Sequence, residues 1–251
     1  MVRISLPFLS YEPDATMIPC PVCRVENDEF ATTCRSCKAF LQNRVVNLDL
    51  FETAWKILEA PKKTFQRIAI AEHKNYSLAL FSMFGISLSF TLFWYLRLGD
   101  RFDTLLDLVP TALGAGLVLG LLSSVVLSGL YHGFAKLLGG KTSFRNSFAI
   151  LAYAATPVVL SLFLVLPIEL LTFGMYLFTW NPHPYTIKPV SYVALIGFDG
   201  IMALWSVLLA TLGTVVGHHV DIIKAIVIVL LTVGMYGFLL LAAAQQVLAI
   251  L

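Results

Sequence analysis

The sequence predicts an all-α integral membrane protein, in which a five-helix transmembrane bundle follows a small four-cysteine ribbon and interfacial amphipathic helices. Of its 251 residues, 58% are hydrophobic and only 13% are charged, whereas about 25% of a soluble domain is charged. Residues 1–77 hold 19 of the 32 charged side chains, and all four cysteines lie within residues 20–37. So apolar a chain cannot cover itself with a polar surface, which excludes an ordinary soluble enzyme, a disordered chain and a secreted disulfide scaffold.

Charge and cysteine position divide the chain into four parts. We expect a loose N-terminal tail at 1–19, a ribbon at 20–41, a linker with amphipathic helices at 42–77, and a membrane domain at 78–251. Met17 stands directly before Ile18, Pro19 and Cys20. Translation could therefore start at Met17 instead of Met1, and the sequence leaves that choice open.

Two Cys-x-x-Cys pairs, separated by ten residues, predict a metal site. The ligands are Cys20, Cys23, Cys34 and Cys37. Two such turns can aim four thiolates at one point, which is the tetrahedral arrangement that Zn²⁺ prefers. The sequence has no fifth cysteine and no histidine nearby, so we expect a structural zinc ion and no catalysis. Disulfides, free thiols and iron are the alternatives, and a cytoplasmic location disfavours disulfides.

The ribbon is expected to bind a protein and no nucleic acid. A 22-residue unit cannot build a core, so metal binding must supply its folding free energy. Residues 20–44 carry four basic and three acidic side chains, whereas a phosphate-binding surface is normally more basic. A cytoplasmic or membrane protein is therefore the expected partner, alongside the lipid bilayer itself.

Residues 48–60 predict an amphipathic helix with Leu48, Phe51, Trp55 and Leu58 on one face. Pro61 ends this helix and can start the next, at 62–72. The apolar face suits the headgroup layer of a membrane, because basic side chains lie beside it. The alternative is that the same face packs on the ends of the transmembrane helices.

Five windows of at least 21 residues without Asp, Glu, Lys or Arg predict five spans, at 78–98, 110–135, 146–172, 195–217 and 225–249. The third apolar run continues past Glu169 to Trp180. We favour one long helix kinked at Pro167, and a helix with a re-entrant segment is the alternative. Pro157 frees a backbone carbonyl that a hydroxyl or a neighbouring helix must satisfy.

The connections predict orientation and local geometry. Lys and Arg number eight on the side of residues 62–74 and three on the other side, which places the N-terminus in the cytoplasm and the C-terminus outside.

Gly139 and Gly140 predict a tight reversal between spans 2 and 3. Gly116 and Gly120 form a GxxxG pattern. We expect it to pack helices within the chain, and a homo-oligomer is the alternative.

Ionisable residues in or near the spans are the other functional candidates. They are His132, Glu169, Asp199, His218, His219 and Asp221. Adjacent histidines in a turn rarely converge on a metal, so a second metal site is not expected. No metalloprotease, nucleophile-elbow or P-loop motif is present in the sequence. We therefore expect no catalytic residues and a protein that is not an enzyme.

Several stretches resemble the Yip-domain family of five-span membrane proteins. They are Trp55 to Pro61, Leu137 to Lys141, Ala152 to Pro157, Trp205 with Gly213, and Lys224 to Ile226. The resemblance covers residues 48–251. Eukaryotic members associate with Rab GTPases in the early secretory pathway, a property that we do not carry over to this chain.

The ribbon is similar to the zinc ribbons at the N-termini of many bacterial and archaeal membrane proteins, although Arg24 and Lys38 replace the usual glycines. That similarity implies the plasma membrane of a prokaryote. The expected function is a non-enzymatic membrane adaptor or membrane-organising protein, with the ribbon as the docking headpiece. The alternative is a small transporter or channel with a regulatory zinc-binding headpiece.

Overall fold

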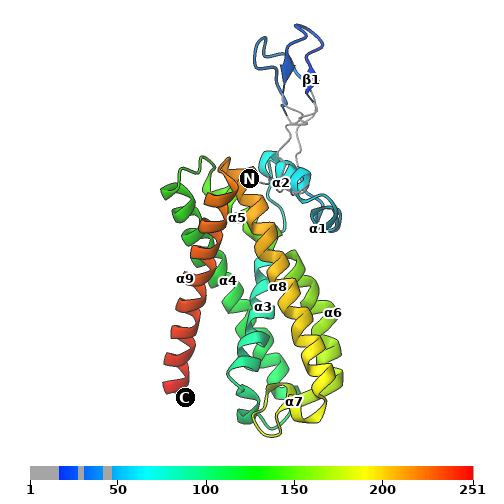
Figure 1. Ribbon diagram of the computed structural model, residues 1–251, viewed down its shortest axis with the longest axis vertical. Coiled ribbons are helices and arrows are strands. Elements are labelled where there is room, and N and C mark those ends of the chain that lie inside the picture. Colours follow the sequence, from blue (N-terminus) through cyan, green and yellow to red (C-terminus); the bar gives the residue numbers. More distant parts are fainter. Residues whose placement is uncertain (1–16, 28–30, 42–46, 251) are drawn as a thin grey trace, which may run out of the picture. The chain divides into compact units, whose positions relative to one another are not determined.

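A computed structural model describes residues 17–27, 31–41 and 47–250. Internal contacts divide the chain into two compact units, Met1–Val46 and Asn47–Leu251, and each is described here by itself (Figure 1). Most of the predicted N-terminal tail, residues 1–16, lies outside the described residues.

The first unit is a minimal ribbon. Strands β1 (Ile18–Pro19) and β2 (Glu26–Asn27) pair antiparallel, and a single bridge joins Thr33 to Phe40. Among the described residues of this unit, only Cys20, Asn27 and Cys34 are buried. The described residues of this unit therefore form no apolar core that could hold them together.

The second unit begins with two short helices, α1 (Leu50–Glu59) and α2 (Pro61–Ile70), as predicted. The Asp49 carboxylate caps α1 by accepting a hydrogen bond from the Glu52 N–H at 2.7 Å. Pro61 starts α2, where its missing N–H costs nothing. Helix α2 packs against α5 and α8, and its Phe65 and Ile68 side chains are fully buried.

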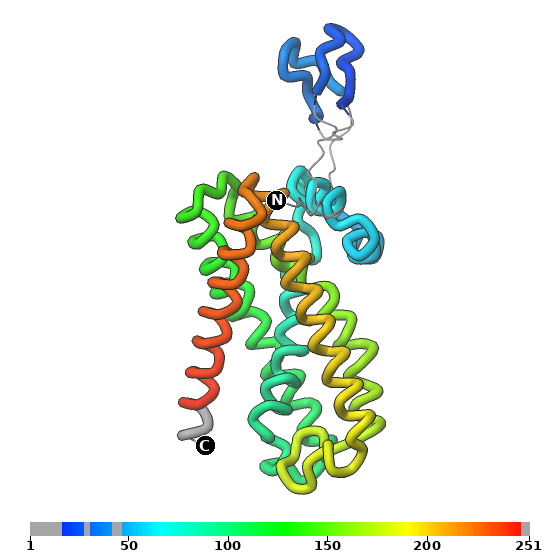
Figure 2. The backbone as a smooth tube through the Cα atoms, in the orientation of Figure 1, coloured from blue at the N-terminus to red at the C-terminus, as the bar shows by residue number. Residues whose placement is uncertain are grey.

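Five helical elements are long and apolar enough to cross a membrane, which confirms the predicted fold class (Figures 1 and 2). They are α3 (Ser77–Tyr95), α4 (Leu105–Leu137), the composite α5 (Phe144–Ala154), α6 (Thr156–Phe173) and η2 (Gly174–Phe178), then α8 (Pro189–His218) and α9 (Ile222–Ile250). Short helices η1 (Leu98–Arg101) and α7 (Pro184–Ile187) lie in the connections. Helices α4, α8 and α9 expose apolar side chains, as lipid-facing helices do; Leu122, Leu204 and Leu230 are each more than half exposed.

The third span is a single apolar element that runs past Glu169, as expected, but it is built of two helices. Helix α6 continues through Pro167, and the helix is interrupted at Ala155, two residues before Pro157. Pro157 has no N–H to donate to the preceding turn, so a new helix starts there. The predicted hydroxyl is present, because Thr156 Oγ1 donates to the Tyr153 carbonyl at 2.6 Å.

Helices α3 and α4 make the most extensive contact in the bundle, and they do so through glycine. Gly116 faces Ile86, and Gly120 faces Phe81 and Ser82, so the GxxxG pattern lies against α3 of the same chain. Small residues let the two backbones approach closely, and they gain dispersion contacts along the interface.

Helix α2 and the α4–α5 and α8–α9 connections lie at one end of the helical unit (Figure 1). Most Lys and Arg residues of the unit lie in or beside these segments, so we call this end the basic end. Gly139, at φ +90°, makes the predicted reversal after α4. The Lys141 N–H then donates to the His218 carbonyl at 3.3 Å. At the opposite end, the Arg97 guanidinium donates to the Leu177 carbonyl at 3.0 Å and contacts His183 Nε2 at 2.7 Å.

Candidate metal centre

Two matching turns build the site in the ribbon. In the first, the Arg24 N–H donates to the Cys20 carbonyl at 2.9 Å; in the second, the Lys38 N–H donates to the Cys34 carbonyl at 3.0 Å. Each turn therefore curls a Cys-x-x-Cys pair so that both of its sulfurs point to the same side. The two-residue spacing within each cysteine pair therefore produces the same turn in both halves of the ribbon.

The residue after each cysteine pair adopts left-handed backbone geometry. Arg24 has φ 57° and Lys38 has φ 60°. Glycine adopts this region without steric cost, whereas a side chain costs about 1–2 kcal/mol. This explains physically why similar ribbons carry glycine here, and it shows that this chain tolerates the strain at both positions.

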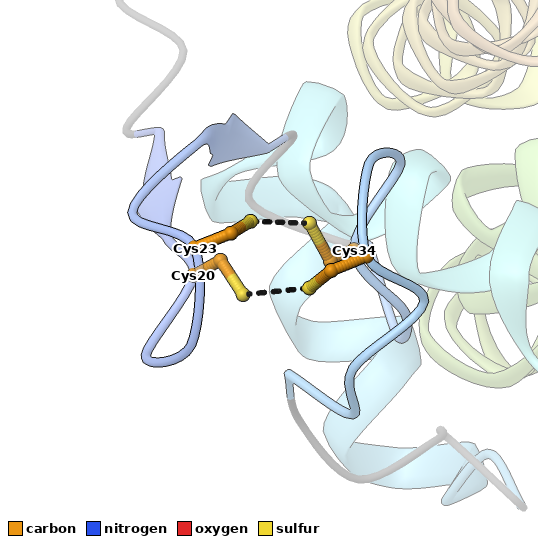
Figure 3. A group of neighbouring side chains, drawn as sticks. Cys20, Cys23 and Cys34 are labelled. Carbon is orange, nitrogen blue, oxygen red and sulfur yellow. Dashed lines mark hydrogen bonds between the residues drawn. The ribbon is translucent and has the colours of Figure 1, made fainter.

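The structure brings all four predicted ligands together. The sulfurs of Cys20, Cys23, Cys34 and Cys37 all lie within 4.8 Å of one another. The Cys20–Cys37 and Cys23–Cys34 sulfurs are 3.5 Å apart (Figure 3). A zinc tetrahedron with bonds of about 2.3 Å has sulfur–sulfur edges of about 3.8 Å, so the arrangement fits such an ion.

The electrostatics of the cluster call for a cation. The Cys37 backbone N–H is the largest cause that lowers the pKa of Cys34, to about 6. The pKa of Cys37 rises to about 12; the Ala39 N–H lowers it, but desolvation and the three neighbouring sulfurs raise it by more. The neighbouring sulfurs therefore disfavour four negative charges together, and a positive ion among them would remove that repulsion.

Asn27 joins the two turns of the ribbon. Its side chain is buried, its Oδ1 accepts from the Arg35 N–H at 2.8 Å, and its Nδ2 donates to the Val25 carbonyl at 2.6 Å. The cysteine spacing alone assigned no role to Asn27. Its spacing from both cysteine pairs is the one sequence signal that could have indicated this role.

Within the described part of the chain, the four cysteines are the one group of three or more Cys, His, Asp or Glu side chains close enough to share a metal. His219 and Asp221 are exposed, while His218 is fully buried. Ser147 Oγ lies between two rings, 2.9 Å from His132 Nδ1 and 3.1 Å from His218 Nε2. The adjacent histidines thus point apart, as expected.

The structure also unites two carboxyl groups that the sequence separates by thirty residues. Glu169 of α6 and Asp199 of α8 line the same cavity of about 280 Å³. Ser161 Oγ, also on α6, donates to Asp199 Oδ1. Sequence reasoning treated these acids as separate candidates, because no local pattern links positions on different helices.

Comparison with known proteins gives one family. A family model described as the Yip1 domain matches residues 55–244. This range takes in part of α1, all of α2 and α3 to α8, and most of α9, and it excludes the ribbon. Neither the curated proteins nor the solved structures contain a match to the chain.

Proposed function

This chain belongs to the Yip1 domain family of membrane proteins, and from that premise we propose that it is a non-enzymatic membrane adaptor. Its five spans anchor it in the bilayer, and its ribbon, folded around zinc, docks a protein partner. The observation that carries the proposal is the four-sulfur cluster, with all sulfurs within 4.8 Å, in a unit that has no apolar core among its described residues.

Zinc is the metal that the donor set favours. Four thiolates are soft ligands, and a filled d shell accepts a closed tetrahedron without redox chemistry. Such a site leaves no open position for a substrate, so the ion would be structural. Its binding free energy would fold the ribbon, as in other small metal-dependent domains.

The surface of the ribbon suits a protein better than a nucleic acid. Val22 and Phe40 are 72% and 61% exposed, which is unusual for apolar side chains in so small a unit. Basic Arg24 and Arg35 are balanced in part by acidic Glu26. Apolar side chains amid mixed charges are typical of protein contacts, whereas phosphate binding requires a clear basic excess.

Orientation follows from the basic end and from α1. Phe51 and Trp55 are 84% and 65% exposed, while Ile57 on the same helix is fully buried. The two expectations for the amphipathic segment therefore apply to different helices. Helix α2 packs on the bundle, whereas the aromatic side chains of α1 are exposed. We place those aromatics in the cytoplasmic headgroup layer, with the N-terminus inside, the C-terminus outside, and the chain in a prokaryotic plasma membrane.

The first experiment measures zinc in the purified full-length protein by mass spectrometry of the metal. We expect one zinc ion per chain, lost in Cys34→Ser and retained in Ser36→Ala, the matched control in the same turn. A metal-free protein with an intact ribbon would contradict the zinc assignment.

The second experiment tests docking by crosslinking in intact cells followed by purification. A partner should be captured by the wild type and lost with Cys34→Ser. It should also be lost with the double variant Val22→Asp, Phe40→Asp, which keeps all four ligands and should keep zinc. Equal capture by all three proteins would show that the partner does not bind the ribbon.

A further inference from the structure

A cavity of about 280 Å³ lies inside the bundle, between α3, α6, η2 and α8. Its walls are mainly apolar and aromatic, and include Phe90, Trp94 and Phe178. Two acidic side chains, Glu169 and Asp199, also line it. The combination of aromatic walls with two carboxyl groups, inside a transmembrane bundle, needs a physical explanation.

Glu169 is the more informative of the two acids. It is only 4% exposed, and its Oε1 atom is buried without a hydrogen-bond partner in the protein. Asp199 is better satisfied, because Ser161 donates to its Oδ1. Burying a carboxyl oxygen without a hydrogen-bond partner is unfavourable in a low-dielectric interior, so the chain leaves this polar atom unsatisfied by its own groups.

No lysine, arginine or histidine is among the residues that line the cavity. Its lining therefore offers carboxyl oxygens as hydrogen-bond acceptors and no cation of its own. We propose that it binds a small organic ammonium ion, with the ammonium group between Glu169 and Asp199 and the carbon atoms against the aromatic walls.

Two features favour an organic cation over a metal ion. A hard metal ion needs about six oxygen ligands or retained waters, whereas most of the lining is hydrocarbon and Ser161 already donates to Asp199. Aromatic faces instead attract ammonium groups, most strongly when both are shielded from water. Phe90 lines the cavity beside the acids, whereas the Trp94 ring already has the Arg97 guanidinium 5.4 Å from its centre.

Access is lateral, between α3 and α8. Thr91 of α3 and Gly200 and Ala203 of α8 line the cavity and are also exposed. The helical contacts of the bundle run from α3 to α6 and from α6 to α8, so α6 forms the back of the cavity. A soluble amine and the amine headgroup of a lipid share the required chemistry, and both are tested below.

The test is calorimetric titration of the full-length protein in neutral detergent with ethylammonium chloride, and with sodium chloride as the ionic control. We expect saturable binding of ethylammonium alone. Glu169→Gln and Asp199→Asn should each weaken it by at least about tenfold, because each removes one partner of a buried charge pair. Asp103→Asn, the same change at an exposed carboxylate near α4, should leave the affinity unchanged.

A second variant guards against misfolding of the carboxyl variants. Gly200→Leu keeps both acids and narrows the cavity, and a Cβ at Gly200 meets nothing within 4 Å. It too should weaken ethylammonium binding. Competition by phosphatidylethanolamine but not by phosphatidylglycerol would identify the ligand as a lipid headgroup, and no competition would identify a soluble amine.

Three results would overturn the proposal. They are the absence of saturable ethylammonium binding, sodium binding of equal strength, or unchanged affinity in both Glu169→Gln and Gly200→Leu. None of these results bears on the proposed adaptor function, because its tests measure zinc content and partner capture by the ribbon.

Discussion

The close contact between α3 and α4 makes a sharp prediction at Gly85. A Cβ atom built there would lie 2.1 Å from the Gly120 nitrogen, 2.2 Å from the Gly120 Cα and 2.5 Å from the Gly116 carbonyl oxygen. All three atoms belong to the backbone of the neighbouring helix. No side-chain rotation can relieve the overlap in Gly85→Ala, so the two helices must move apart.

The size of the effect follows from these distances. Separation must grow from 2.1 Å to the ordinary contact limit near 3.4 Å, and the shift loosens the most extensive helix contact of the bundle. Overpacking typically costs 1–3 kcal/mol. Because rigid backbone is involved, we expect a loss of about 3 kcal/mol in the free energy of unfolding, at the upper end of that range.

Chemical unfolding of the purified protein in mixed micelles measures this loss. Gly114→Ala is the matched control, since Gly114 lies on α4 and a Cβ there meets nothing within 4 Å. Its stability should be unchanged or slightly raised by the better helix propensity of alanine. If Gly85→Ala proved as stable as Gly114→Ala, the tight α3–α4 contact would be wrong.

Three other predictions concern the ribbon and α1. Lys38→Gly removes left-handed strain and should slow zinc loss to a chelator, whereas Arg35→Gly, which relieves no such strain, should not. Asn27→Ala removes a buried side chain and deprives the Arg35 N–H of its acceptor, and it should weaken zinc binding about tenfold in a chelator competition; unchanged affinity would show that Asn27 does not join the turns. Hydrogen bonds from Lys56 and Arg67 lower the pKa of Glu52. Their stabilisation is therefore present at neutral pH and lost as the pH falls below the ordinary value of 4.5. The melting-temperature difference between wild type and Glu52→Gln should be small at pH 7, since the pair is exposed, and should vanish near pH 3; a pH-independent difference would refute the assignment.

Sequence reasoning worked best where a property is local or periodic. A bilayer demands long charge-free helices, so five spans could be counted from composition alone. The spacing of Cys20, Cys23, Cys34 and Cys37 implied convergence, because each turn positions its own two sulfurs. The carbonyl freed by Pro157 was predicted to need a hydroxyl or a neighbouring helix, and the Thr156 hydroxyl supplies the hydrogen bond.

It failed where two candidate positions compete or where helices must be placed side by side. A kink was expected at Pro167, and an interruption near Pro157 was not predicted, because periodicity does not rank the two prolines of the third span. The structure interrupts the helix at Ala155, beside the first. From the sequence, the apolar face of α1 could be expected to contact either the membrane or the bundle, because both environments stabilise the same apolar side chains.

By itself, the sequence determined that this is a five-span membrane protein with a four-thiolate ribbon, because hydrophobic length and ligand spacing are properties of short segments. Only the tertiary structure decided that the GxxxG pattern faces α3 and that α1 keeps Phe51 and Trp55 exposed. Only the structure placed Glu169 and Asp199 in one cavity. Their pairing depends on how α6 and α8 pack, and that packing is set by the fit of whole helix surfaces, which no single segment encodes.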